Sequence, residues 1–349
     1  MKSSLASQWS AFLVVGGMLA TSALPLHAQT SGWEQRARAY ARGYVRPVSA
    51  PSPADNATTP ARVALGKALF FDPRLSRSNF VSCASCHNPA LSWGDGNARG
   101  TGDEMRTLGR RTPTLLNVAW AEALFWDGRA ATLEAQALGP VTSAAEMNLK
   151  LDDLVVRLSA VPAYVAMFER GYPGQGITGV TIGKAIAAYE RTIVSGRSSF
   201  DRWVAGDPRA ISEEAKQGFV LFNTSGRCSQ CHAGWRFTDD GFQDIGLPGE
   251  DVGRGKYVDL PEVQHTFKTP TLRNVDRRAP YMHDGSVATL EQVIDLYDQG
   301  GQAQRPSLSA EMHALNLKPE EKRALIAFLR TLTSDDRPTT IPVLPRGQQ

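Results

Sequence analysis

The 349-residue chain has no long uncharged apolar run of the kind that crosses a membrane. A spanning helix needs about 20 apolar residues, and the run from Ala11 to Ala20 reaches about half that length. This run follows Lys2 and ends before the small residue Ala28, which is the pattern of a cleaved export signal over residues 1–28. The sequence therefore predicts a secreted, periplasmic protein without a membrane span.

The chain also lacks a strong net charge. Its 38 Lys and Arg residues nearly balance its 35 Asp and Glu residues, which leaves a formal charge of +3. A near-neutral chain has no long-range field to attract nucleic acid or an anionic membrane, so neither is predicted as a partner. Without the signal, the length fits two domains, predicted at 29–198 and 199–349.

Cysteine is scarce, and this scarcity is informative. All four cysteines fall into two CxxC pairs, each followed directly by histidine: CASCH at 83–87 and CSQCH at 228–232. This is the spacing of c-type haem attachment, in which both thiols bind the haem covalently and the histidine binds its iron. A zinc ribbon has a much shorter gap between its pairs, and a thioredoxin-like dithiol needs no adjacent histidine. We expect two haem c groups. Their attachment residues are Cys83, Cys86, Cys228 and Cys231, and their iron ligands are His87 and His232.

Strand-like alternation is rare, whereas helical periodicity recurs along the chain. Helices are predicted at Leu65–Phe71, Leu151–Leu158, Ile182–Val194, Glu213–Phe222, Leu290–Tyr297 and Lys318–Leu332. Segments rich in Gly, Asp and Pro, at Trp93–Arg111 and Trp235–Lys268, are predicted to be long ordered loops. The fold class is therefore mainly α.

An internal repeat supports a duplication. RTPTLLNVAWAEALFWDGRAATLEAQALGP at 111–140 aligns without a gap with KTPTLRNVDRRAPYMHDGSVATLEQVIDLY at 268–297. In this alignment Trp126 matches His283, and Pro140 matches Tyr297. If the last position faces the haem in both halves, Pro140 offers the first iron no ligand atom and Tyr297 offers the second a phenolate oxygen. From spacing alone, Tyr297 also fits a packed aromatic on the apolar face of its helix.

Several runs spread over the mature chain carry a family likeness: LFFDPRLS, SCASCH, RTPTLLNV, FWDGRA, EAQALGPVTSAAEM, FKTPTLRNV and APYMHDGS. They resemble the bacterial dihaem cytochrome c peroxidases and their relatives of the MauG type. The resemblance implies two cytochrome c-like helical domains, with a peroxide-binding haem in the first and an electron-transfer haem in the second.

The resemblance also implies roles around the first haem. Trp126 falls at the family's bridging tryptophan, and Gln136 and Glu146 fall at its distal glutamine and glutamate. A carboxylate suits the proton transfer that splits an O–O bond, and an amide can orient peroxide. Without the resemblance, Gln136 and Glu146 would be typical solvated residues.

Tyr297 distinguishes two branches of this family. Conventional peroxidases are similar but carry methionine there, whereas the MauG type carries tyrosine as the second iron ligand. An anionic phenolate favours higher oxidation states than a thioether does. The resemblance thus implies an oxidoreductase that uses hydrogen peroxide to form a high-valent dihaem state and oxidises aromatic residues, notably tryptophan, of a partner protein.

Histidine usage agrees with an open first iron. Conventional members often carry a histidine before the bridging tryptophan that blocks this iron. Here the histidines are His27, His87, His232, His265, His283 and His313, so none lies between the haem motifs apart from their own. Met282, His265, His283 and His313 remain competitors of Tyr297. The alternatives are a conventional peroxidase that takes electrons from a small cytochrome or copper protein, and a non-enzymatic electron carrier.

Two departures from the family limit the likeness. Its members bind calcium between the haems through an asparagine that falls at Arg111 and carbonyls that fall at Arg278 and Pro280. Arg111 places a cation where a ligand is expected, which leaves calcium binding open. The surface tryptophan through which MauG passes electrons corresponds to about Gly226, so Trp203, Trp235 and Tyr257 are the candidate exits.

Overall fold

The computed structural model describes residues 32–336 and 338–346, so the predicted export signal at 1–28 lies outside the described residues. No helix in these two ranges combines the length and apolarity that a membrane crossing requires.

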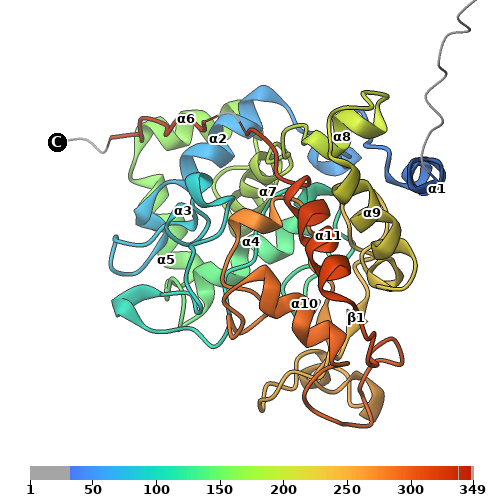
Figure 1. The fold of residues 1–349 in the computed structure, drawn as a ribbon. Coiled ribbons are helices and arrows are strands. Elements are labelled where there is room, and N and C mark those ends of the chain that lie inside the picture. The colour runs from blue at the N-terminus through green and yellow to red at the C-terminus, as the bar shows by residue number, and fades with distance from the viewer. Residues whose placement is uncertain (1–31, 337, 347–349) are drawn as a thin grey trace, which may run out of the picture.

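Helices dominate the described chain, as predicted (Figure 1). They are α1 (Gly32–Ala41), α2 (Pro60–Phe70), α3 (Cys83–Cys86), α4 (Leu133–Thr142), α5 (Leu151–Ser159), α6 (Pro162–Gly171), α7 (Gly179–Glu190), α8 (Ser199–Val204), α9 (Glu213–Asn223), α10 (Leu290–Asp298) and α11 (Pro319–Arg330). Two short strands, β1 (Phe242–Gln243) and β2 (Phe267–Lys268), pair antiparallel. The predicted loops at 93–111 and 235–268 contain short 3₁₀ turns and, in the second, these strands.

All six predicted helices form, and their ends differ by a few residues. Helix α2 begins at Pro60, five residues before the predicted Leu65, and α7 stops at Glu190 instead of continuing to Val194. There the backbone carbonyl of Ile193 leaves the helix to accept a hydrogen bond from the Asn117 N–H at 2.9 Å. Helices α1, α3, α4, α6 and α8 were not predicted. The signal for α4 is obscured because Gly139 and Pro140 lie inside it and disfavour helix.

Two helix crossings of the same design form the centres of the two halves. Helix α2 packs on α7, and α9 packs on α11. A Cβ atom added to Gly66 would lie 1.8 Å from the Ala185 carbonyl oxygen, and one added to Gly218 would lie 1.9 Å from that of Ala324. Glycine therefore permits the close approach of the backbones in both crossings. In each pair one helix precedes the CxxCH motif and the other closes the domain.

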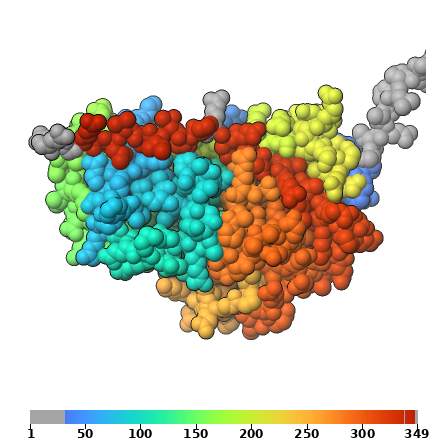
Figure 2. Space-filling model, turned by 60° about the vertical axis from the view of Figure 1, so that its left-hand side comes forward, coloured from blue at the N-terminus to red at the C-terminus, as the bar shows by residue number. Residues whose placement is uncertain are grey.

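Each half has its own buried core, but the chain termini cross over. Residues Leu65–Ile193 supply the first core, and Phe200–Leu332 supply most of the second. Helix α1 and Tyr44 pack into the second core, where Tyr44 contacts the rings of Phe200, Phe219 and Phe237. The C-terminal segment in turn lies over the first half (Figure 2), where the Pro345 carbonyl accepts a hydrogen bond from Arg74 Nη2 at 2.7 Å. The boundary near residue 198 stays a prediction, and the terminal segments reach beyond it in both directions.

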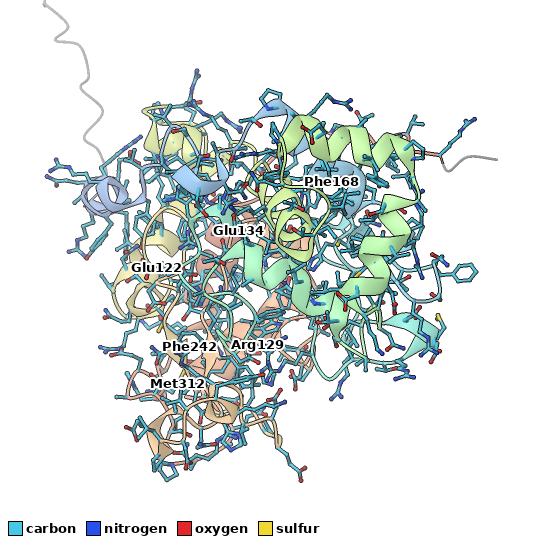
Figure 3. The ribbon with its side chains drawn as sticks, turned by 180° about the vertical axis from the view of Figure 1, so that it is seen from behind. Glu122, Arg129, Glu134, Phe168, Phe242 and Met312 are labelled. Atoms are coloured by element: carbon cyan, nitrogen blue, oxygen red, sulfur yellow. The ribbon has the colours of Figure 1, made fainter. Side chains whose placement is uncertain are left out.

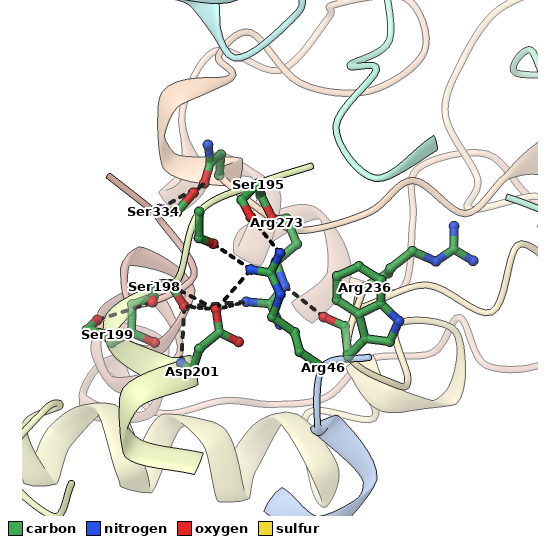
Figure 4. Close-up of polar contacts among 12 residues, drawn as sticks. Arg46, Ser195, Ser198, Ser199, Asp201, Arg236, Arg273 and Ser334 are labelled. Atoms are coloured by element: carbon green, nitrogen blue, oxygen red, sulfur yellow. Dashed lines mark hydrogen bonds and ion pairs between the residues drawn. The ribbon is translucent and has the colours of Figure 1, made fainter. Parts of the chain in front are cut away.

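A buried arginine binds residues 198–201, which connect the two halves, to the second half (Figure 4). Arg273, which is 1% exposed, contacts Asp201 Oδ2 at 2.9 Å and donates from Nε to the Trp235 carbonyl at 2.7 Å. Asp201 also accepts a hydrogen bond from the Ser198 N–H at 2.9 Å, which caps α8. Arg46 approaches the same carboxylate at 3.6 Å. This network fixes residues 198–201, where the chain passes between the halves.

The two halves pack directly on each other. Figure 3 labels Arg129 of the first half and Phe242 of the second, and a Cβ atom at Gly128, the residue before Arg129, would lie 2.2 Å from Phe242 Cζ. The Glu122 N–H donates to Asp240 at 3.2 Å across the same boundary.

The helix crossings yield a test of the fold. Gly218→Ala should lower the free energy of unfolding of the haem-loaded protein by about 1–3 kcal/mol, because the added methyl group overpacks α9 against α11. The control is Gly43→Ala, since a Cβ atom there meets nothing within 4 Å. If both variants unfold at the same denaturant concentration, α9 and α11 do not approach each other closely at Gly218.

Candidate functional site

The two CxxCH motifs form the same local structure. In each, the histidine N–H donates to the carbonyl of the first cysteine at 2.8 Å, for His87 to Cys83 and for His232 to Cys228. The His87 Nδ1 bonds the Trp93 carbonyl at 3.1 Å, and the His232 Nδ1 bonds the Phe237 carbonyl at 2.9 Å. A carbonyl only accepts, so Nδ1 carries the proton and Nε2 keeps its lone pair for a metal. The Nε2 atom of both imidazoles is therefore free to bind a metal ion.

A large apolar cavity adjoins the second motif. It has a volume of about 1330 Å³, part of which is open to solvent, and Cys228, Cys231 and His232 line it together with Tyr297. Its walls include Phe222, Leu272, Val293, Ile294, Leu325 and Leu329. The thiols, the imidazole and these apolar walls are what a covalently attached haem requires, so the residues fit this cofactor.

Tyr297 meets the cavity from α10. Burial raises the pKa of its phenol, and the neighbouring Cys231 and Cys228 thiols raise it further. This electrostatic coupling places the phenol close to the CSQCH motif. The other candidate ligands of the second iron fall into two groups. Met282 and His283 line the same cavity, whereas His265 bonds the Asp251 carbonyl through Nδ1 at 3.0 Å in a different pocket and His313 is not among the lining residues.

His283 is held by stacking. Its ring lies on Phe267 with 3.6 Å between centroids and 12° between planes. Burial lowers the pKa of His283 to about 4, so its ring is neutral at pH 7. These contacts make His283 a packed aromatic residue of the cavity wall.

The internal repeat is also a repeat in space. Helices α4 and α10 begin one residue after the equivalent caps Thr132 and Thr289, so Pro140 and Tyr297 occupy the same helical position. Val293 lines the second cavity. Its equivalent is Gln136, which shares a helix face with Pro140 because the two are four residues apart. By analogy with Val293 and Tyr297, Gln136 and Pro140 are predicted to face the first motif.

Hydrogen bonds hold the backbone of Glu146 between the end of α4 and the loop that follows the first motif. Its N–H donates to the Ser143 carbonyl at 3.0 Å, and its carbonyl accepts from the Asp103 N–H at 2.5 Å. Burial raises the pKa of the Cys86 thiol to about 11, and the nearby carboxylates of Asp95 and Glu146 raise it further. The Glu146 carboxylate therefore lies near the predicted first haem.

Trp126 contacts both halves of the molecule. Its indole Nε1 donates to the Arg111 carbonyl at 2.8 Å, and its own carbonyl accepts from the Lys268 N–H at 2.7 Å. Its ring meets His283 edge-on at 6.4 Å between centroids, and it lines the second cavity. Trp126 therefore lies at the boundary of the two halves, beside the cavity of the second motif.

The candidate electron exits differ in access to solvent. Trp203 is fully buried in the second core, so it does not reach the surface. Tyr257 is 51% exposed. Trp235 is partly buried, and it packs edge-on against Trp120 of the first half at 4.8 Å between centroids.

A buried acid near the first motif has no counterpart in the sequence predictions. Glu190, at the end of α7, is 4% exposed, and its Oε2 has no hydrogen-bond partner within the described chain. Burial raises its pKa to about 8. Burial raises the pKa of the Cys83 thiol, and the neighbouring Glu190 carboxylate raises it further, so the two side chains are close. In the sequence, Glu190 directly follows the apolar run 185–189, which is the one signal of its burial.

Comparisons with known proteins agree with this geometry. Residues 60–209 match the family described as di-haem cytochrome c peroxidase, and residues 215–333 match cytochrome c. The methylamine utilization protein MauG of Methylorubrum extorquens is 48% identical over 96% of both chains. Its namesake from Methylophilus methylotrophus is 46% identical over 86% of this chain and 91% of that one.

A solved structure supports the same fold. A crystal structure of a MauG-like protein associated with microbial copper homeostasis superposes with a TM-score of 0.78 at 30% identity. The match covers 84% of this chain and 94% of that one.

Proposed function

The chain belongs to the di-haem cytochrome c peroxidase family, and we propose that it uses two covalently bound haems c and hydrogen peroxide to oxidise a partner protein. It is a haem-containing oxidoreductase of the peroxidase type, similar to MauG over nearly its full length. The partner is a periplasmic protein whose tryptophan or other aromatic residues lose electrons. The export signal expected at 1–28 and the c-type attachment motifs support the periplasmic location.

One observation carries the MauG-type assignment: Pro140 and Tyr297 occupy the same position of equivalent helices. The side chain of Pro140 has no atom that can bind a metal, so a haem held by the first motif would remain accessible to peroxide. Tyr297 would supply an oxygen ligand to a haem held by the second motif. In this proposal the first haem reacts with peroxide, and the second haem has no position open to it.

The bound haems supply the iron at which hydrogen peroxide takes up two electrons and two protons to give two water molecules. The chain supplies the proton path. Glu146 accepts the proton of the inner peroxide oxygen at its carboxylate and returns it to the outer oxygen. Gln136 hydrogen-bonds the peroxide and sets its orientation. Trp126 passes electrons between the two haem sites, and the two electrons come from the partner.

A conventional peroxidase is the second candidate, and one observation favours it. Met282 and Met312 line the same cavity as Tyr297, so a thioether is available to the second iron. Methionine ligation would suit a haem that receives electrons from a small cytochrome or copper protein.

The two candidates separate in a donor assay. We expect the protein, given peroxide, to oxidise a co-purifying or genomically neighbouring periplasmic protein, with a mass change on an aromatic residue detected by peptide mass spectrometry. Reduced small cytochrome c should be oxidised slowly. Fast turnover of the cytochrome with no modified residue would instead establish a conventional peroxidase.

Glu146→Gln should slow the reaction with peroxide by about 10²–10⁴-fold, because the amide cannot shuttle the proton. Stopped-flow absorption of the haems measures this rate. Glu104→Gln, an exposed acid in the neighbouring loop, is the matched control and should react at the normal rate. If both variants match the parent protein, Glu146 does not carry the proton.

Trp126→Phe should keep both haems attached and peroxide binding intact, yet slow oxidation of the partner, because phenylalanine is far harder to oxidise than tryptophan. Partner oxidation after a single addition of peroxide measures this. Trp33→Phe in α1, a residue 37% exposed, is the control. Unchanged partner oxidation in Trp126→Phe would remove the relay.

A further inference from the structure

Two arginine side chains are buried where the halves meet. Arg111 is 6% exposed and Arg278 is 8% exposed, and both line an interdomain cavity of about 690 Å³ together with Trp126. Arg111 Nη2 donates to the Arg278 carbonyl at 2.6 Å, and Arg278 donates to the Thr271 carbonyl. In residues 32–336 and 338–346 neither guanidinium forms an ion pair, and neither Nε has a hydrogen-bond partner.

This is the place where the family resemblance puts a calcium ion, and the residues do not fit one. The Arg278 carbonyl, an expected ligand, is occupied by the Arg111 guanidinium. The expected side-chain ligand is itself that guanidinium, which has five N–H donors and no acceptor. Calcium needs six to eight oxygen ligands, and here it would also meet two buried positive charges.

We propose that the Arg111 guanidinium takes the place of the interdomain calcium ion and joins the halves as a cation built into the chain. It projects from the first half and binds the 278–283 segment of the second. Buried guanidinium groups require negative partners, and the carboxylates that a haem carries have the required sign. Unlike a metal ion, this cation cannot dissociate or be chelated.

The same residue positions the relay, a step that rests on the proposed function. The Arg111 backbone carbonyl accepts the Trp126 indole N–H at 2.8 Å, and the Arg111 N–H donates to the His283 carbonyl at 2.7 Å. The side chain and backbone of Arg111 therefore fix Trp126 and the 278–283 segment to each other. Arg111 is a positioning residue, because it acts on electron transfer through Trp126.

Metal analysis of the haem-loaded protein tests the substitution. The protein is incubated with EGTA, desalted and compared with protein held in 1 mM calcium chloride. We expect no stoichiometric calcium by elemental mass spectrometry, and identical unfolding temperatures, haem absorption and electron paramagnetic resonance spectra. A tightly bound calcium ion, or a spectrum that changes on chelation and recovers with calcium, would overturn the proposal whatever the substrate of the enzyme is.

Variants at Arg111 test its positioning role. Arg111→Asn should retain both haems but lower the unfolding temperature, alter the resonance spectrum and slow electron transfer between the haem sites about tenfold or more. Arg111→Lys, which keeps a cation, should restore most of the loss. Arg209→Asn on the exposed surface is the control. If Arg111→Asn behaves like Arg209→Asn in all three measurements, Arg111 does not join the halves.

Failure of this proposal is distinguishable from failure of the proposed function. Calcium content, unfolding temperature and the ferric spectra need neither peroxide nor a partner protein. A protein indifferent to peroxide, but free of calcium and dependent on Arg111, would refute the function and leave the built-in cation in place.

Discussion

Asn117 and Asn274 hold the two halves of the molecule in the same shape. Each amide is fully buried and bonds the chain just beyond the last helix of its own half, Asn117 Oδ1 accepting from the Ser195 N–H at 3.1 Å and Asn274 Oδ1 from the Ser334 N–H at 2.9 Å. Because buried amides tolerate few other partners, this constraint fixes the segment between each CxxCH motif and its closing helix. Helices α4 and α10, which follow these segments, therefore occupy equivalent places in the two halves. The difference between Pro140 and Tyr297 is then a difference of chemistry on a common scaffold.

The halves cooperate through the small set of contacts around Trp126. Its indole is bound by the first half, its backbone by the second, and its ring faces the wall of the second cavity. A relay between two irons needs a fixed position, because electron-transfer rates are sensitive to distance. A buried guanidinium supplies that rigidity without a metal, and the exchange of chain termini between the cores adds to it. The residues of the proposed peroxide site, Gln136 and Glu146, both belong to the first half.

The sequence predicted the chemistry better than the packing. The CxxCH motifs, the helical class and the gapless repeat follow from local patterns. The structure confirms the helical class and shows that the ends of the two repeat units form equivalent helices, α4 and α10. Helix α4 escaped prediction because Pro140 weakens its local signal while tertiary contacts maintain it. The packing of Tyr44 into the second core and the burial of Glu190 depend on contacts between distant segments, which no local pattern encodes. The roles of Gln136, Glu146 and Trp126 came from family resemblance and stay predictions.

The central claim is that one duplicated scaffold holds two chemically different irons, and electron paramagnetic resonance of the ferric protein tests it most directly. The account predicts one high-spin signal from the first iron, which lacks an outer ligand, and one low-spin signal from the second, ligated by Tyr297. Both signals should fade after one equivalent of hydrogen peroxide. Two low-spin signals that peroxide leaves unchanged would contradict the account and identify an electron carrier.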